Sequence, residues 1–179
     1  MILRRPSHAA LSILVSLTLW SGCKNPAPTT DPVQTEMAAY KQSVEPPIQK
    51  SEEIAKVFVQ IVLDDKGNPD PDRAAQRIQS EVLPKAQEFL EQVKTITPRQ
   101  QGLVDLHQFL VQAATLRVEG YQQIVDGYSK KNLETFTQGQ KKVTESKIQE
   151  DNYIAQADRL LRNYGYELVY FSAPPSTTN

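Results

Sequence analysis

The chain is short of the residues that build most disulfide, metal and nucleotide sites. Its 179 residues include one cysteine, two histidines, one tryptophan and seven glycines. A single cysteine excludes a disulfide within one chain and any metal cluster held by cysteine alone. A Gly-x-Ser-x-Gly element and a glycine-rich phosphate loop are also missing, which argues against two common classes of enzyme. We therefore expect no catalytic residues, no bound metal and no cofactor.

The chain also lacks an excess of either positive or negative charge. The 20 basic and 21 acidic residues give a formal charge of −1. A protein that binds nucleic acid by electrostatic attraction normally carries a basic excess, so we expect no nucleic-acid partner. Long apolar runs are absent too, because the longest uncharged apolar stretch, residues 9–20, has 12 residues. A membrane-spanning helix needs about 20.

That short apolar stretch has the form of an export signal. It follows Arg4 and Arg5, and a positive start before a short apolar core is typical of a secretory signal peptide. We predict that residues 1–22 are such a peptide and are removed from the mature protein.

The signal ends in Leu19-Trp20-Ser21-Gly22-Cys23, which resembles the lipobox of bacterial lipoproteins. The resemblance implies that Cys23 is acylated and becomes the mature N-terminus, which places the protein in the cell envelope with the membrane as its partner. Two or more acyl chains are enough for stable anchoring. The residue after Cys23 is Lys24 rather than an aspartate. By resemblance to enteric sorting rules, this favours the outer membrane, if the organism has one. The alternative is a free exported thiol at Cys23.

Proline-rich segments flank the remaining chain. Residues 23–34 contain three prolines and little apolar content, so we predict a flexible tether behind the lipidated cysteine. Residues 24–34 would reach roughly 34 Å at about 3.1 Å per residue in an extended polyproline conformation. Residues 172–179 are expected to form a disordered tail.

Between these tails the apolar residues recur at intervals of three and four, which predicts helices. We expect an all-α fold for residues 35–171, an antiparallel up-down four-helix bundle, because short connections place successive helices side by side. The four predicted helical segments are 35–63, 70–96, 98–128 and 133–164. A short apolar strap at 166–171 is expected to cross the end of the bundle.

Prolines and capping residues mark the predicted boundaries. We expect Pro46-Pro47 to break or kink the first segment, and Pro84 to bend the second without dividing it. Asp70 is predicted to cap the second segment, Asn132 the fourth, and Thr97 the third in a capping box with Gln100. The fourth segment is less apolar, and its predicted inward residues are Leu133, Phe136, Val143, Ile148, Ile154, Ala155 and Leu161.

Two polar residues fall on the apolar face of the third segment. His107 is the only histidine of the mature chain, so it is either a half-buried structural residue or a ligand or catalytic base. Arg117 must be paired or reach water. We expect an interhelical pair with Glu81 or Glu145, and the alternative is bidentate binding of a carboxylate or phosphate.

The stretch from Pro84 to Tyr121 resembles a segment that recurs in uncharacterised bacterial lipoproteins with an exported helical domain. The resemblance supports the predicted fold and the predicted cell-envelope location, and it implies no activity. The leading hypothesis is a non-enzymatic envelope lipoprotein that binds a protein partner or forms part of an assembly. The second hypothesis is a small-molecule or metal-binding helical module that uses His107, Arg117 and a groove beside the fourth segment.

Overall fold

The computed structural model describes residues 31–64 and 70–165, and within these ranges it contains helices and no strands, which confirms the all-α class. The predicted signal peptide, Cys23, the strap at 166–171 and the tail at 172–179 lie outside the described residues. The helical elements are α1 (Pro32–Asp64), α2 (Pro71–Arg77), the π-helix η2 (Ile78–Val82), α3 (Leu83–Thr95), α4 (Gln101–Ser129) and α5 (Leu133–Arg162).

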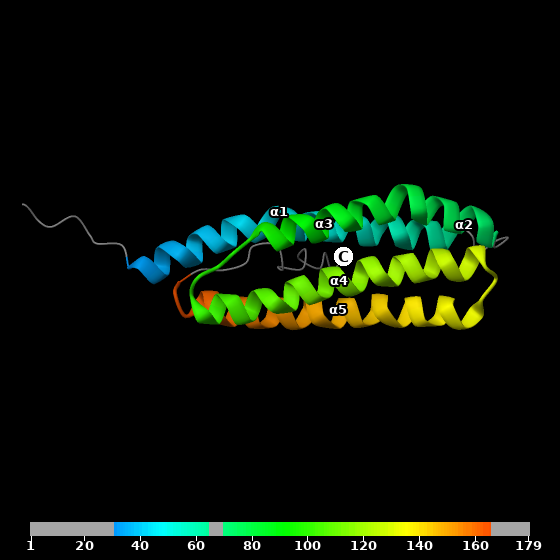
Figure 1. Ribbon diagram of the computed structural model, residues 1–179. Coiled ribbons are helices and arrows are strands. Elements are labelled where there is room, and N and C mark those ends of the chain that lie inside the picture. Colours follow the sequence, from blue (N-terminus) through cyan, green and yellow to red (C-terminus); the bar gives the residue numbers. More distant parts are fainter. Residues whose placement is uncertain (1–30, 65–69, 166–179) are drawn as a thin grey trace, which may run out of the picture.

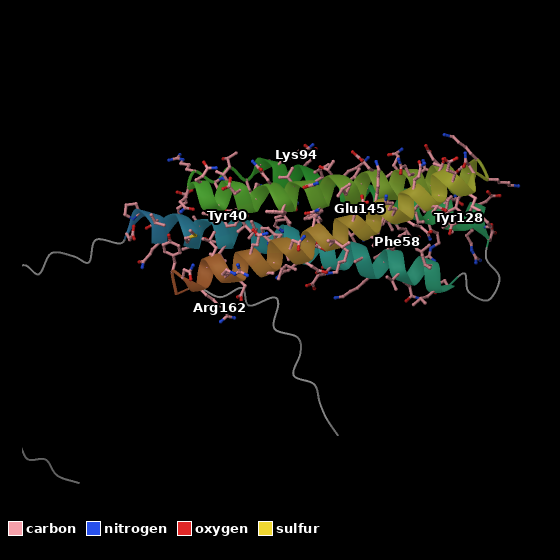
Figure 2. All side chains as sticks on the ribbon, turned by 90° about the horizontal axis from the view of Figure 1, so that it is seen from below. Tyr40, Phe58, Lys94, Tyr128, Glu145 and Arg162 are labelled. Atoms are coloured by element: carbon pink, nitrogen blue, oxygen red, sulfur yellow. The ribbon has the colours of Figure 1, made fainter. Side chains whose placement is uncertain are left out.

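The helices form two layers along one long axis (Figure 1). The run from α2 through η2 to α3 lies beside α1 in one layer, and α4 lies beside α5 in the other. The colour gradient reverses direction from each long segment to the next, so the start of α1 and the end of α5 lie at the same end of the molecule. In Figure 2, α5 crosses α1 obliquely rather than running parallel to it.

Helix α1 differs from its prediction at two places. It begins at Pro32, three residues inside the predicted tether, and the Asp31 carboxylate accepts a hydrogen bond from the Val33 N–H at 2.9 Å. Of the expected break or kink, the break does not occur, since the helix continues through Pro46 and Pro47. Each proline removes one backbone donor. Pro47 is itself buried, so packing of this stretch against the core offsets the lost hydrogen bonds.

The second predicted helix is continuous, as expected, from Pro71 to Thr95. Its predicted cap is confirmed, since the Asp70 side chain accepts from the backbone N–H groups of Asp72 and Arg73. The effect of Pro84 appears one turn earlier as the π-helix η2, which ends where the Leu83 N–H donates to the Ile78 carbonyl. The wider turn lets the helix pass a residue that lacks an N–H donor.

The capping box predicted at Thr97 is wrong. Helix α4 begins at Gln101, and the Gln100 side chain caps it by accepting from the Leu103 N–H at 3.1 Å. The connection before it is held from another helix, because the Glu36 carboxylate of α1 accepts from the N–H groups of Arg99 at 2.5 Å and Gln100 at 2.8 Å. This tertiary contact adds to the local cap at Gln100.

Helix α5 has the predicted ends and a different inward face. Asn132 accepts from the Thr135 N–H at 3.1 Å, which confirms the cap, and Gly165 has a φ of +80° just beyond the last turn. Three predicted inward residues, Leu133, Ile148 and Ala155, are exposed, and Leu133 reaches 76%. Phe136, Val143, Ile154 and Leu161 do meet the core. The remaining inward positions are Gly139, Ser146, Glu150, Tyr153 and Ala157.

Glycines let α4 and α5 pack backbone to backbone. A Cβ atom on Gly127 would lie 2.5 Å from the Phe136 nitrogen, and one on Gly139 would lie 2.7 Å from the Ile124 nitrogen. The Ser146 hydroxyl adds a hydrogen bond across this interface to the Ala113 carbonyl at 2.7 Å. The α4–α5 pair is therefore the tightest part of the fold.

Candidate functional site

Both polar candidates of the third predicted segment are buried on α4. His107 is 7% exposed and Arg117 is 4% exposed. They are ten residues apart on one helix, which separates them by about 15 Å along its axis. Each belongs to a different polar cluster, and each cluster joins α4 to α1 and α5.

The first group, which we call the arginine cluster, consists of Arg117, Glu150 and Ser51. The Arg117 Nη2 atom donates to Glu150 Oε2 at 2.7 Å, and Nη1 donates to both the hydroxyl and the carbonyl of Ser51. The Ser51 hydroxyl in turn donates to Glu150 Oε1. The guanidinium carbon also lies 5.9 Å from the centre of the Phe89 ring. Both charges of the cluster are therefore paired and hydrogen-bonded inside the protein.

The partner of Arg117 is on α5, and it is neither of the two residues expected from the sequence. Glu81 pairs with Arg77 on its own helical run at 2.9 Å, and Glu145 lies 3.8 Å from Lys141. Glu150 lies on the inward face of α5 instead, one turn after Ser146 and one turn before Tyr153. A search for small and polar residues at intervals of three and four would have found this face, whereas a count of apolar residues did not.

The second group, which we call the tyrosine–histidine chain, joins four helical elements. The Tyr40 hydroxyl of α1 lies 3.2 Å from His107 Nδ1 and is hydrogen-bonded to the Tyr153 hydroxyl of α5 at 3.3 Å. The other ring nitrogen of His107, Nε2, lies 3.0 Å from the Val93 carbonyl of α3. Figure 2 shows Tyr40 on the N-terminal half of α1.

Burial is the main cause of the pKa shifts in the tyrosine–histidine chain. It lowers the pKa of His107, although the hydrogen bond to the Val93 carbonyl opposes the shift. It raises the pKa values of Tyr40 and Tyr153. All three side chains are therefore neutral near pH 7. Sequence analysis identified His107 but missed both tyrosines, because their partners lie 67 and 113 residues away along the chain.

Three cavities border these clusters. One of about 360 Å³ lies between α1 and α5, with Ser51, Arg117 and Glu150 in its lining and Lys147 and Asp151 at its rim. A second of about 540 Å³ lies beside His107, between α4 and the connection at Thr97 and Pro98, and its other walls are mostly apolar. The largest, about 870 Å³, lies between α1 and residues 92–99 and includes Tyr40.

Residues 31–64 and 70–165 contain no set of three histidine, cysteine or acidic side chains placed to hold a metal ion. Within the same ranges, no helix has both the length and the apolar character to cross a membrane.

No family model, curated protein or solved structure matches the chain.

Proposed function

We propose that the protein is a lipid-anchored cell-envelope protein of non-enzymatic, binding or structural type. In this proposal residues 1–22 are a signal peptide, Cys23 carries the lipid, and the helices form an up-down four-helix bundle on a short tether. The outer membrane is the favoured location if the organism has one, and the partner is another envelope protein.

The observation that carries the proposal is the position of the only cysteine. Cys23 stands directly after a short apolar run and the small residues Ser21 and Gly22, where a lipoprotein signal would end. The buried polar groups support the non-enzymatic part, because the ionic and hydroxyl groups of the arginine cluster bond to each other across helices. Such an arrangement joins helices and leaves neither charge unpaired.

Replacement of the cysteine tests the anchor. We expect Cys23→Ser to move the protein from the detergent-extracted membrane fraction to the soluble fraction while its helical circular dichroism stays unchanged. The matched control is Lys24→Ser, which changes the next residue and should keep the anchor. Mass spectrometry of the N-terminal peptide should find acyl chains on Cys23 in the control. A Ser variant that still requires detergent for extraction would contradict the proposal.

A second candidate function is the binding of a small molecule in the α1–α5 cavity. The observation that favours it is that a buried ion pair, Arg117–Glu150, lines a cavity of about 360 Å³. A ligand at about 100 times its dissociation constant would add about 2.7 kcal/mol to stability, so thermal denaturation with ligand pools would detect it. Asp151→Ala at the rim should abolish that gain, whereas Glu134→Ala, on α5 but not part of the cavity lining, should keep it.

A further inference from the structure

We propose that the tyrosine–histidine chain is an acid-sensitive latch that holds α1 against α4 and α5 at neutral pH and releases it when His107 takes up a proton. The inference depends on the three hydroxyl and imidazole groups and on no anchor, ligand or partner. It therefore stands apart from the proposed function.

The proton order of the chain follows from its end at Val93. A backbone carbonyl can only accept, so His107 Nε2 must carry the imidazole proton and donate it to the Val93 oxygen. A neutral imidazole has one N–H, so Nδ1 has a lone pair and accepts from the Tyr40 hydroxyl. The Tyr40 and Tyr153 hydroxyl oxygens lie 3.3 Å apart. Because the Tyr40 proton is directed at Nδ1 in this order, Tyr153 must be the donor and the Tyr40 oxygen the acceptor of their hydrogen bond. In this order every donor has an acceptor.

Protonation of His107 reverses this order. Nδ1 becomes a donor to the Tyr40 oxygen, so the Tyr40 proton must turn toward the Tyr153 oxygen. The Tyr153 proton then loses its acceptor, on a side chain that is 0% exposed. The protonated state thus contains a buried charge and an unpaired buried hydroxyl, and both are unfavourable in a protein interior.

Among the described residues, the groups bonded to His107 and the lining of the cavity beside it carry no charge that could offset that cost. The groups that meet His107 and its hydrogen-bond chain are Tyr40 from α1, Tyr153 from α5 and the Val93 carbonyl from α3. The side chains that line the cavity beside His107 carry no charge: Thr97, Pro98, Val104, Gln108, Val111 and Leu116, with Gln112 and Thr115. Glu36, one turn from Tyr40, is held by the amides of Arg99 and Gln100. The same cavity provides a route for protons to reach the ring.

Helix α1 is the element that such a change would free. It lies in one layer with α2 and α3, whereas α4 and α5 pack backbone to backbone in the other. Tyr40 and Ser51 are two points at which α1 hydrogen-bonds to the second layer. Loss of the Tyr40 connection leaves the N-terminal half of α1 with weaker attachment, while the α4–α5 pair keeps its own contacts.

Nitrogen-15 NMR of the full chain in detergent tests the proton order directly. At pH 7.5 we expect the His107 ring to be the neutral tautomer with the proton on Nε2. Its signals are separated from those of His8 by their loss in His107→Gln. A neutral tautomer with the proton on Nδ1 would overturn the proposal.

Urea unfolding between pH 7.5 and 5.5 tests the energetic consequence. Because the unfolded histidine binds a proton near pH 6.5 and the folded one resists it, stability should fall as pH falls. The unfolding equilibrium constant should rise by up to about tenfold per pH unit below 6.5. His107→Gln should remove this dependence, Tyr40→Phe should reduce it, and Tyr121→Phe, another buried tyrosine, should leave it unchanged. Equal slopes in the wild type and His107→Gln would overturn the latch.

Amide hydrogen exchange then locates the change. After correction for the intrinsic pH dependence of exchange, residues 32–48 should lose protection below pH 6 while α4 and α5 keep theirs. Equal loss in all helices would show that the proton destabilises the whole bundle, and this result would also overturn the latch.

Discussion

At the scale of single residues, the ion pairs of this protein differ widely in burial. The side chains of Arg117 and Glu150 are 5% and 11% exposed, whereas those of Lys147 and Asp151, a pair on the surface of α5, are 60% and 58% exposed. Exposed pairs contribute about 0–1 kcal/mol because water and salt screen them. Removing one partner of a buried pair costs far more, since the remaining charge stays in the interior without compensation.

We therefore predict a strongly non-additive double-mutant cycle in the arginine cluster. Glu150→Leu and Arg117→Met should each lower the free energy of unfolding by roughly 3–5 kcal/mol in urea titrations. The double variant should be more stable than the sum of the two effects requires, because it leaves no unpaired charge. The control Asp151→Ala should change stability by no more than about 0.5 kcal/mol. Additive effects of the two substitutions would contradict the coupling.

At the scale of helices, the two prolines in α1 and the one in the run from α2 to α3 affect helix geometry differently. Pro46 and Pro47 lie in an uninterrupted α-helix, whereas Pro84 is preceded by the π-helix η2. A proline can disturb a helix by the lost donor and by a clash with the preceding turn. Packing in α1 and a wider turn before α3 absorb this disturbance without ending either helix.

The α4–α5 interface makes a prediction about glycine. Alanine normally stabilises a helix interior by about 1 kcal/mol relative to glycine. At Gly127 a Cβ would meet the nitrogen, Cα and Cβ of Phe136 at 2.5–2.7 Å, so we expect Gly127→Ala to destabilise by roughly 1–3 kcal/mol. Urea unfolding measures the difference.

The matched control for this prediction is Gly102→Ala on the same helix. The atoms nearest to its Cβ would be side-chain atoms, at the end of Gln100 at 3.2 Å and on Leu160 at 3.8 Å, which can move more easily than backbone, so the change should be neutral or stabilising. Similar stabilisation at Gly102 and Gly127 would show that the helices are not in backbone contact.

At the scale of the whole molecule, carboxylates hold α1 to its neighbours near both ends. The backbone amides of Gln100 and Arg99 lower the pKa of Glu36, and hydrogen bonds from Arg77 lower the pKa values of Asp64 and Glu81. The contacts of Glu36 and Asp64 connect α1 to the start of α4 at one end and to α2 at the other, whereas Glu81 pairs with Arg77 within its own helical run.

These shifts predict a second phase of acid destabilisation, separate from that of His107. The ordinary pKa values are 4.5 for Glu36 and Glu81 and 3.8 for Asp64. Because the folded pKa values are lower, the unfolded state binds protons first, so the stabilisation is present above these values and is lost as pH falls through the lowered ones. Urea midpoints measured from pH 5 to 3 should decline.

The variants separate the two acid phases. His107→Gln should retain the decline below pH 5, and a Glu36→Gln, Asp64→Asn double variant should reduce it. A midpoint that stays constant or rises toward pH 3 would contradict the prediction.

The sequence by itself determined the helical class, most helix boundaries and the apolar faces of α1, α3 and α4. Asp70 and Asn132 act as caps because a side-chain oxygen bonds to backbone groups two or three residues away. The buried residues Ile54, Val93 and Leu110 follow the intervals expected for an inward stripe. These features depend on neighbours within one or two turns, so the local pattern is sufficient to predict them.

Only the tertiary structure decided which polar groups meet. The pairing of Arg117 with Glu150 rather than Glu81 or Glu145, the hydrogen bonds of Tyr40 and the support that Glu36 gives to α4 all join residues from different helices. Such contacts depend on the rotation and the axial position of one helix relative to another. For α5, the close backbone packing against α4 determines its rotation and its axial position. A one-turn shift or a small rotation would bring other residues together without changing the periodicity of either sequence, so no pattern within one helix could specify them.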